Sequence, residues 1–421
     1  MKVGVISLGC AKNLVDTERL LGKLRAGGAE LVKDPTKAEL IVINTCGFIE
    51  PAKVEAIDNI LEFAHKKKVI VMGCLVERYK EELMREIPEV MAYFGTESWE
   101  EVVEFLGLGG EGKAKRILTT PKSYAYLKIS EGCNRLCSFC AIPLIRGRHR
   151  SKPMEELLEE ARYLASEGIK ELCIVSQDTT YYGRDLYKKG QLIKLLENLE
   201  KIEGIRWIRL LYLYPTEVEE LLSYIPYSEK VLPYFDIPLQ HVSTRVLKSM
   251  RRGYDEKFVI NLIEKIRKTL PEAVLRTTFI VGYPEEGEED YKKLKNFLLE
   301  GHFHWVGIFT YSQEEGTHAY SLGDPLPEEE KEKRKEELMS LQEGITLRKN
   351  QELLDKELEL LVDGFDEEFG FVPVGRVWLQ APEVDGKTYL ETEREVRVGE
   401  VLKVKVNQVG GYDLGAVEDV H

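Results

Sequence analysis

Three cysteines fall within a short segment, Glu131–Arg150, which reads EGCNRLCSFCAIPLIRGRHR. Cys133, Cys137 and Cys140 follow CxxxCxxC spacing. Three thiolates this close together can bind three irons of a four-iron cluster and leave the fourth iron open to another ligand. A structural zinc site usually requires four ligands in two pairs. No fourth Cys or His stands at that spacing here, so the segment favours an iron–sulfur cluster.

Three further cysteines, Cys10, Cys46 and Cys74, each follow a predicted strand in the first third of the chain. These strands alternate with helical patterns, which is the βαβ order of a parallel sheet. The predicted elements are Val3–Leu8, Leu14–Leu24, Leu40–Asn44, Val54–Ala64, Val69–Met72 and Glu77–Glu86. Because parallel strands end at one edge of a sheet, we expect the three thiols to converge there.

Glycines flank these cysteines, at Gly9, Gly47 and Gly73, and would leave the backbone room for a bulky group. The alternative is that each cysteine is a small core residue, which is the usual place of an unligated Cys. Three cysteines at equivalent positions in successive units favour a second metal site over that alternative.

Composition bounds the class of protein. At 421 residues the chain should hold two to four domains, and 43% of its residues are hydrophobic. The net charge of −14 argues against a broad electrostatic contact with nucleic acid. No apolar run approaches the roughly 20 residues of a membrane span, and the N-terminus is too short for a signal segment. We therefore expect a cytoplasmic protein with no membrane contact, whose cysteines are ligands and not disulfides.

The patterns predict three domains: residues 1–106 with the parallel sheet, 124–350, and 353–421, with a glycine-rich linker over 107–123. The central part alternates six strands with helices, which predicts an incomplete (β/α)6 barrel. Its predicted strands are Ala125–Ile129, Glu171–Ser176, Arg206–Tyr212, Tyr234–Ile237, Val274–Val281 and Trp305–Tyr311. Polar or glycine residues follow several of these strands, where a β/α barrel builds its chemistry: Gln177, Asp178, Gln240, His241 and Gly282.

Short strands separated by Gly and Asp turns fill the last part of the chain. They predict a small antiparallel β-barrel of the oligonucleotide-binding kind, after a long charged helix over Glu328–Asn350. From Gln351 to His421 there are 17 acidic and 7 basic residues, a net charge of −10. Most of the net negative charge of the chain, −10 of −14, therefore lies in this one domain.

The loop Glu131–Cys140, with Phe139 before its third cysteine, resembles the cluster loop of radical S-adenosylmethionine (SAM) enzymes. Other segments resemble the methylthiotransferases of that class: SLGCAKNLVDTER, NTCGFI, GCLVERY, VSQDTTYYG and PLQHVSTRVLKSMRRGY. The terminal barrel resembles their TRAM domain. The resemblance covers essentially the whole chain, and it implies an enzyme that transfers a sulfur-containing group.

The resemblance implies two [4Fe–4S] clusters and SAM as cofactors. Cys133, Cys137 and Cys140 would bind one cluster, and Cys10, Cys46 and Cys74 the other. Candidate cofactor contacts are Phe139, Gln177, Asp178, Gln240, His241 and Gly282. No side chain is assigned to acid–base catalysis, because radical chemistry on an unactivated carbon does not depend on it.

Three assignments stay open at this point. His241 is either a structural hydrogen-bond partner or a functional group. Arg146, Arg148 and Arg150 either pair with carboxylates near the cluster loop or form a solvated turn. Cys173 lies in the apolar run ELCIV, which predicts a core position.

Two branches of the family differ in substrate. One adds a methylthio group to the β-carbon of an aspartate in small-subunit ribosomal protein number twelve, and the other modifies an adenosine beside the tRNA anticodon. LVDTER, NTCGFIEPAKVEAID and SQDTTYYG resemble the first branch. An acidic terminal barrel would repel tRNA phosphates and suit a basic ribosomal protein. Further expected partners are a reductant such as flavodoxin or ferredoxin, and a sulfur donor.

A different class, a two-cluster electron-transfer protein, remains an alternative at this stage. Such carriers need four cysteines for each cluster, whereas this chain offers three.

Overall fold

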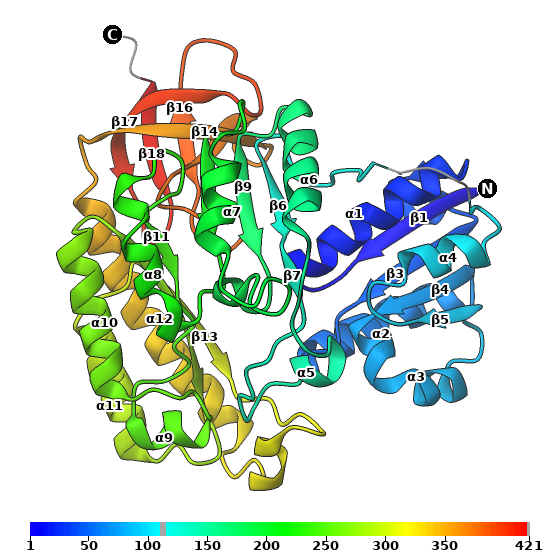
Figure 1. The fold of residues 1–421 in the computed structure, drawn as a ribbon, viewed down its shortest axis with the longest axis horizontal. Helices are drawn as coiled ribbons and strands as arrows, with labels where there is room; N and C mark the ends of the chain where they lie inside the picture. The colour runs from blue at the N-terminus through cyan, green and yellow to red at the C-terminus, as the bar shows by residue number, and fades with distance from the viewer. Residues whose placement is uncertain (110–114, 419–421) are drawn as a thin grey trace. The chain divides into compact units, whose positions relative to one another are not determined.

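The computed structural model describes residues 1–109 and 115–418, and the described chain forms two compact units (Figure 1). The first unit comprises Met1–Thr119, Glu131–His149 and Ser312–Thr317, and the second comprises the remainder. Part of the predicted linker, residues 110–114, lies outside the described residues. Because the units do not follow chain order, the domain boundaries expected from the sequence stay predictions.

A five-stranded parallel sheet forms the first unit, with strand order β2-β1-β3-β4-β5. Its strands are β1 (Lys2–Ser7), β2 (Glu30–Val32), β3 (Leu40–Thr45), β4 (Lys68–Gly73) and β5 (Ala92–Phe94). Its helices are α1 (Ala11–Ala26), α2 (Glu50–Ala64), α3 (Cys74–Glu86), α4 (Trp99–Phe105) and the short α5 (Ile142–Ile145), with a 3₁₀ turn η1 (Pro35–Lys37). The predicted parallel sheet is confirmed.

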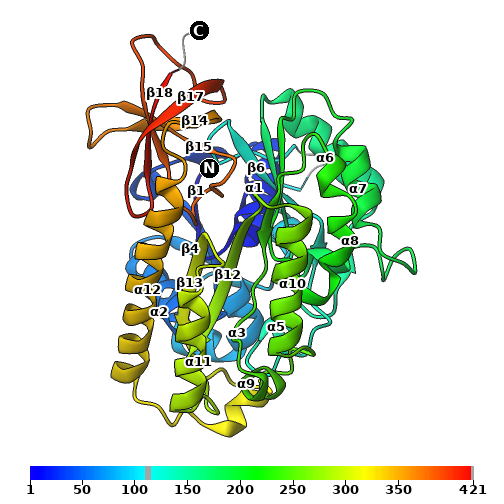
Figure 2. The ribbon, with the colours of Figure 1, turned by 90° about the vertical axis from the view of Figure 1, so that its left-hand side faces the viewer.

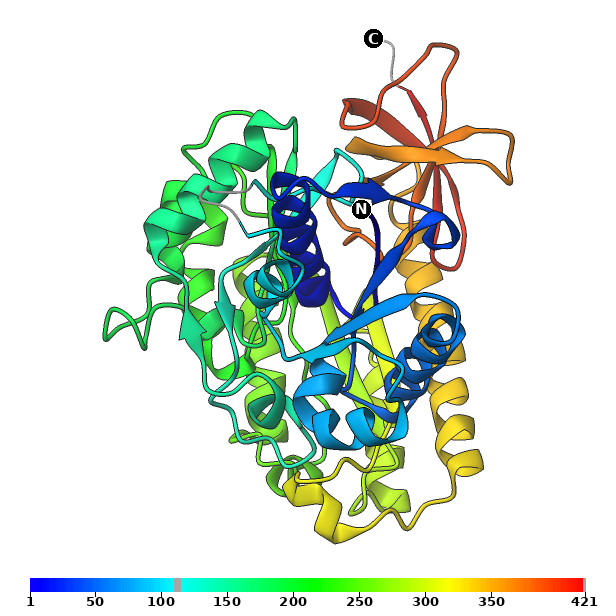
Figure 3. The ribbon, with the colours of Figure 1, turned by 90° about the vertical axis from the view of Figure 1, so that its right-hand side faces the viewer.

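Helices cover both faces of this sheet, as Figure 3 shows. Residues of β3 alternate between the faces: Ile41 and Ile43 pack with α2 and α3, while Leu40 and Val42 pack with α1 and α4. A strand that is buried on both faces reads as a continuous apolar run, which is why the sequence signal is clear. Each such side chain contributes about 1.5–3 kcal/mol by burial. The strand ends are therefore held rigidly.

Six parallel strands form the incomplete barrel of the second unit, with helices α10, α11 and α12 alongside β12 and β13 (Figure 2). They lie in two groups, β10-β9-β6 and β11-β12-β13, joined where Ile208 pairs with Val231. The strands are β6 (Tyr124–Lys128), β9 (Glu171–Val175), β10 (Trp207–Leu210), β11 (Tyr234–Asp236), β12 (Val274–Val281) and β13 (Trp305–Thr310). The predicted incomplete barrel is confirmed.

The connections carry the helices and several 3₁₀ turns. The helices are α6 (Met154–Ser166), α7 (Leu192–Leu199), α8 (Glu219–Leu222), α9 (Thr244–Ser249), α10 (Glu256–Thr269), α11 (Glu288–Leu299) and α12 (Glu328–Gln351). The 3₁₀ turns are η2 (Thr179–Tyr181), η3 (Pro215–Glu217), η4 (Ile225–Tyr227) and η5 (His318–Leu322), and two short strands, β7 (Ser130–Glu131) and β8 (Arg150–Ser151), flank the cluster loop. Among the described helices, none is long and apolar enough to cross a membrane.

The terminal barrel is closed, in the order β14-β15-β16-β18-β17. Its strands are β14 (Glu357–Asp366), β15 (Val372–Val377), β16 (Thr388–Glu391), β17 (Val401–Val409) and β18 (Leu414–Glu418). One pair, β16 with β18, is parallel, although the sequence predicts a wholly antiparallel barrel. The reason is topological: five strands cannot close into a ring with every neighbouring pair antiparallel.

The connection between β15 and β16 contacts the first residues of β11 and β13, and also Arg209 of β10. The Trp305 indole donates to the Leu379 carbonyl at 2.7 Å, and Arg209 Nη1 donates to the Trp378 carbonyl at 2.9 Å. Tyr234 donates its hydroxyl to Asp385 at 2.6 Å. The terminal barrel is therefore fixed at the strand ends opposite those followed by the predicted cofactor residues.

Candidate functional site

The first unit holds both cysteine trios. Cys74 packs in a small apolar cluster with Ala141 and Ile145, and Phe48 packs against that cluster. Ala141 directly follows Cys140 of the cluster loop. The loop that begins after β6 is therefore in direct contact with the sheet edge that carries the dispersed cysteines. All seven cysteines lie in the described residues and none forms a disulfide.

The dispersed cysteines stand at the carboxyl ends of strands, as predicted. Cys10 is the N-cap of α1, Cys74 is the first residue of α3, and Cys46 follows β3. Backbone N–H groups and the helix dipole at an N-terminus favour the thiolate over the thiol. Two of the three thiols are thus presented at positive ends of helices.

The glycines beside these cysteines let the loops approach one another. A Cβ added to Gly9 would lie 2.7 Å from the Cβ of Cys46. One added to Gly47 would lie 2.7 Å from the Cα of Leu75, the residue after Cys74. Real side chains do not tolerate such distances, so only glycine fits. The sequence led us to expect space for a bulky group beside these glycines. At Gly9 and Gly47 the neighbouring cysteine loop fills that space instead.

The three thiols experience opposing influences on their pKa. Burial raises the pKa of Cys10, but Lys12, the backbone N–H of Asn13 and the Arg146 charge together bring it below its usual value. Burial raises the pKa of Cys46. Burial also raises the pKa of Cys74 to about 12, against the lowering effect of Arg146. Positive charge is therefore directed at this trio from two side chains.

Arg146 lies at the centre of a buried polar network. Its Nη1 donates to Asp16 at 3.0 Å and to Glu131 at 2.9 Å, and its Nη2 donates to Cys74 Sγ at 3.3 Å. Nη2 also donates to the Asn13 side-chain oxygen. Of the two interpretations left open by the sequence, carboxylate pairing holds for Arg146, while Arg148 and Arg150 are exposed.

Asp16, Glu97 and Glu131 bring one carboxylate oxygen each within 4.8 Å of one another, a spacing that could suit a cation. Arg146 donates to two of the three, however, and its guanidinium supplies the balancing charge. Burial lowers the pKa of Arg146, but Cys74, Glu131 and Asp16 raise it well above its usual value. Arg146 therefore stays protonated, and its charge balances these carboxylates without a metal ion.

Both trios offer sulfur donors alone. Among residues 1–109 and 115–418, neither cysteine trio brings its three sulfur atoms within 4.8 Å of one another. A single zinc requires all its sulfurs about 2.3 Å from one centre. In a four-iron cluster each thiolate binds its own iron, so the sulfurs stand further apart. The spacing does not match a preformed single-zinc site, and the binding of clusters by these cysteines stays a prediction.

The cluster loop is held by its own backbone. The Cys133 N–H donates to the Gly147 carbonyl at 3.1 Å, and the Cys140 N–H donates to the Cys137 carbonyl at 3.1 Å. Gly132 has φ +76°, and a Cβ there would lie 2.3 Å from the Arg148 carbonyl oxygen. The loop therefore closes tightly around its three cysteines, with Phe139 half-buried between Cys137 and Cys140.

Gln177 and Asp178 follow β9 in the second unit, as predicted. Asp178 is buried and accepts a hydrogen bond from the Thr180 hydroxyl at 2.6 Å. Its carboxylate thus shapes the turn η2. The assignment of these two side chains to cofactor binding stays a prediction.

Gln240 and His241 follow β11. Gln240 adopts a left-handed φ of +72° and joins the edge of β12, where its N–H donates to the Thr278 carbonyl. His241 is fully buried. Its Nδ1 accepts from the Ser243 N–H at 3.0 Å, and its Nε2 lies 3.1 Å from Glu286. Both ring nitrogens of His241 therefore have hydrogen-bond partners, as expected if this histidine has the structural role that the sequence left open.

Glu286 connects this histidine to Gly282. Its other oxygen accepts from the Gly282 N–H at 3.0 Å and from Arg334 at 2.8 Å. Gly282 has φ +75°, and a Cβ there would lie 2.3 Å from Cγ of Lys331. Packing of the lysine stem therefore accounts for this glycine, and its role beside the cofactor stays a prediction.

Sequence reasoning missed the residues that join the loops of the first unit. Asn13 donates to the Leu8 carbonyl at 3.0 Å and to the Thr45 carbonyl at 2.9 Å. Glu314, which follows β13, accepts from Arg78 at 2.6 Å and from Lys53 at 3.2 Å. Apart from Leu8, which is 5 residues from Asn13, these partners lie 32 to 261 residues apart in sequence, so no local pattern reveals them.

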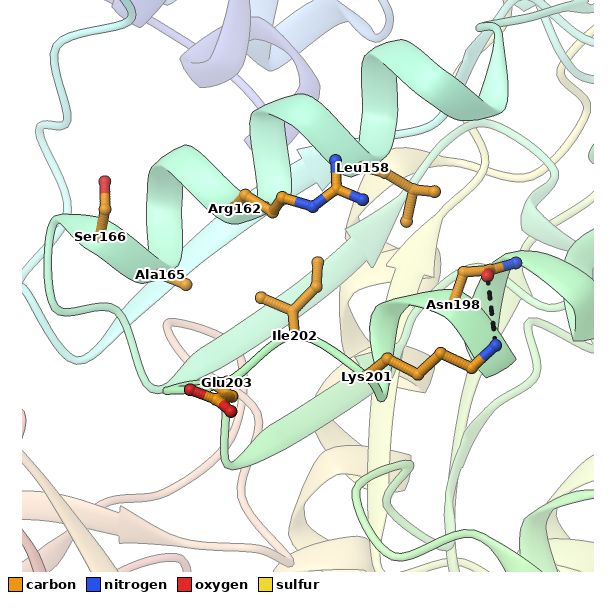
Figure 4. Close-up of a pocket in the computed structure, with 8 residues that line it drawn as sticks. All are labelled: Leu158, Arg162, Ala165, Ser166, Asn198, Lys201, Ile202 and Glu203. Carbon is orange, nitrogen blue, oxygen red and sulfur yellow. Dashed lines mark hydrogen bonds between the residues drawn. The ribbon is translucent and has the colours of Figure 1, made fainter.

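The cavity drawn in Figure 4 is a groove of about 430 Å³ between α6 and the end of α7. It is lined by Leu158, Arg162, Ala165, Ser166, Asn198, Lys201, Ile202 and Glu203. It contains no predicted site residue and lies on the helical exterior, so it has no part in the site described here.

A partial β/α barrel with a CxxxCxxC loop after its first strand is the arrangement of the radical SAM enzymes, and this chain is one of them. The Radical SAM superfamily model matches residues 127–298. The model described as Uncharacterized protein family UPF0004 matches residues 2–95, and the TRAM domain model matches residues 356–417. The class therefore rests on both the fold and the sequence.

The chain is 68% identical over 416 residues to the ribosomal protein uS12 methylthiotransferase RimO of Aquifex aeolicus, covering 98% of this chain and 96% of that protein. It is 50% identical to the protein of the same name from Sulfurihydrogenibium, covering 98% of each. The chain belongs to the family of ribosomal protein uS12 methylthiotransferases. A solved radical SAM methyltransferase, TsrM from Kitasatospora setae, shares the fold over 76% of each chain, with a TM-score of 0.53 and 14% identity.

Proposed function

We propose that this enzyme adds a methylthio group to the β-carbon of an aspartate in ribosomal protein uS12, using two four-iron clusters and SAM. The observation that carries the proposal is the contact between Cys74 and Ala141, because it brings the dispersed cysteines beside the cluster loop. An enzyme with a single cluster would need only the three cysteines of the cluster loop. The second trio, placed against it, supports a second cluster that serves the same reaction.

Each trio would leave one iron of its cluster without a protein ligand. Cys133, Cys137 and Cys140 would hold the cluster that binds SAM, and Cys10, Cys46 and Cys74 the one that carries sulfur. When bound, these groups supply the radical chemistry and the methylthio group. The role of the chain is to position them: α1 and α3 present thiolates at their N-termini.

The second unit would contribute the SAM contacts. Gln177, Asp178, Gln240 and His241 lie after β9 and β11, at the carboxyl ends of the barrel strands, where a β/α barrel binds its ligands. Phe139 in the cluster loop completes the proposed set. His241 would act by holding Glu286, and through it the Gly282 backbone N–H, in place.

The acidic terminal barrel supports a protein substrate. The β14–β15 hairpin exposes Phe369 and Phe371, at 64% and 67%, next to the exposed Glu367 and Glu368. Aromatic faces and carboxylates together attract lysine and arginine side chains. Phosphate groups would be repelled. A basic ribosomal protein in the cytoplasm fits this surface, with a one-electron reductant such as flavodoxin or ferredoxin and a sulfur donor as further partners.

The test is incubation of the reconstituted enzyme with SAM, a reductant and a sulfur source, with either uS12 or bulk tRNA as substrate. Mass spectrometry should find a gain of about 46 Da on one uS12 aspartate, the covalent signature of SCH₃ replacing hydrogen. Modification of tRNA in place of uS12 would overturn the proposal.

Cys173 offers a matched control for the cysteine variants. It is fully buried in β9 of the second unit, whereas both trios belong to the first, so Cys173→Ala should retain the iron content and the activity of the unmodified protein. Cys74→Ala should lose iron and methylthiolation together. A Cys74→Ala protein with full iron content would contradict the second cluster.

A further inference from the structure

Arg146 belongs to the cluster loop, yet its side chain ends among the dispersed cysteines. It lies six residues after Cys140, and only 4% of its surface is exposed. Burying a guanidinium is costly unless it is fully paired. Here the pairing comes from two directions, with Glu131 from the start of the same loop and Asp16 from α1.

The remaining donors of Arg146 act on the sulfur site itself. Nη2 is 3.3 Å from Cys74 Sγ, a charge-assisted hydrogen bond when that sulfur is a thiolate. Nη2 also donates to the Asn13 side-chain oxygen. The amide nitrogen of Asn13 in turn holds the Leu8 and Thr45 carbonyls, just before Cys10 and Cys46.

One guanidinium therefore contacts Cys74 directly and reaches the other two cysteine loops through Asn13. Because the fork of an arginine is planar and rigid, it fixes the relative positions of the groups that it joins. A lysine at this position would retain the charge but could not make all of these contacts at once.

We propose that Arg146 is a positioning residue for the second cluster, which fixes the geometry of the Cys10, Cys46 and Cys74 ligands and tunes that cluster through its hydrogen bond to Cys74 sulfur. This inference rests on the second cluster of the proposed function. Hydrogen bonds to ligand sulfurs are one of the factors that set the reduction potential of iron–sulfur clusters. Loss of an outer-shell partner typically weakens metal binding by about 10–100-fold.

The experiment uses the full chain with Cys133, Cys137 and Cys140 changed to alanine, so that any cluster reconstituted from ferrous iron and sulfide reports on the dispersed trio alone. Arg146→Lys and Arg146→Met are made in this parent protein. Arg148→Met is the matched control, because Arg148 is in the same loop and is exposed. The measurements are iron per chain, the rate of iron loss to a ferrous chelator, and the reduction potential followed by paramagnetic resonance.

We expect both Arg146 variants to lose iron about tenfold faster than the parent protein, by analogy with other outer-shell partners. Their clusters should also shift to a more negative reduction potential, with the larger shift in Arg146→Met, which lacks both charge and donor. Arg148→Met should match the parent. Faster iron loss with an unchanged potential in both Arg146 variants would overturn the tuning role.

Other outcomes separate the two levels of the argument. A parent protein that binds no iron overturns the second cluster and this inference with it. A parent that binds iron, with Arg146 variants that match Arg148→Met in every measurement, overturns only the role of Arg146. If circular dichroism shows that both Arg146 variants lose the helical content of the fold, the residue is a structural brace and the inference fails.

Discussion

Removal of the Glu171 charge should loosen the terminal barrel from the β/α barrel. Glu171 is the first residue of β9 and its side chain is fully buried. It accepts from Arg209 Nε at 2.6 Å and from Arg376 Nη1, a side chain of β15, also at 2.6 Å. In the Glu171→Gln variant both buried arginines lose their shared counter-charge.

The magnitude follows from what each arginine retains. Breaking a buried ion pair by removing one partner costs about 3–5 kcal/mol. Arg376 keeps Asp363, at 2.7 Å, and Arg209 keeps the Trp378 carbonyl and the face of the Tyr234 ring. We therefore expect a loss near the lower limit, about 3 kcal/mol, from the free energy of unfolding of the second unit.

The assay is guanidinium unfolding followed by tryptophan fluorescence, since Trp305 and Trp378 both lie at this junction. Glu156→Gln, an exposed acid on α6, is the control and should unfold as the unmodified protein does. Acid adds a second readout. Burial raises the pKa of Glu171, but Arg209 and Arg376 bring it below its usual 4.5. Its contribution is present above pH 4.5 and is lost as the pH falls through the lowered pKa, and Glu171→Gln should lack this dependence.

Equal unfolding midpoints for Glu171→Gln and Glu156→Gln at pH 7 would refute the reasoning. That result would mean that the two arginines are solvated or re-paired once the carboxylate is gone, and that the polar junction does not hold the two barrels together.

Three further results should follow. Burial lowers the pKa of His304 to about 4, so its contribution to stability is complete above about pH 6.5 and fades as the pH falls toward 4. Denaturation at pH 7 and at pH 5 should therefore show that the free energy of unfolding falls by about 2 kcal/mol at the lower pH. The His304→Gln variant should lack this fall. Gly282→Ala should lower the melting temperature, because alanine in the left-handed φ costs about 1–2 kcal/mol and its Cβ would collide with Lys331. A melting temperature equal to that of the unmodified protein would contradict the described packing. Arg78→Met leaves buried Glu314 with one cation fewer, so amide exchange in Ser312–Thr317 should quicken, and unchanged exchange there would show that the ion pair does not hold this segment.

The sequence predicts those elements whose signal is local. Val274–Val281 agrees with its predicted bounds, and α12 ends one residue beyond the predicted Glu328–Asn350, because an apolar run and a charged helix are each complete within one segment. The strands β2 and β5 were not predicted, since three residues carry too little periodicity. The short helices α8 and α9 were missed for the same reason.

The candidate site divides in the same way. The positions of all six cysteines at strand ends or in one loop follow from pattern and spacing, and the structure agrees. The pairing of Arg146 with Asp16 crosses 130 residues, so the sequence could only leave it beside a solvated alternative. The sequence likewise could not predict what fills the space beside Gly282, because Lys331 reaches it from a helix about 50 residues further along the chain.

The junction also refines the electrostatic argument for a protein substrate. Asp363, Glu383 and Asp385 of the terminal barrel bind Arg376, Tyr126 and Tyr234, so their charges are not offered to a partner. Leaving out these acids and buried Arg376 moves the net charge of the domain from −10 to −8. The surface that remains is still strongly acidic, and the preference for a basic partner over tRNA holds.

The same junction sets a distance that the substrate must span. The terminal barrel is attached at the first residues of β11 and β13, while Gln177 and Gln240 follow the carboxyl ends of β9 and β11. A strand of five residues, such as β9, is about 17 Å long. A partner bound to the acidic barrel must therefore extend at least that far to reach the proposed cofactor site. A folded protein with a projecting loop can do so. The reaction should therefore be slower on a short peptide around the acceptor aspartate than on intact uS12. Equal kcat/KM for the two substrates would show that the acidic barrel does not take part in substrate binding.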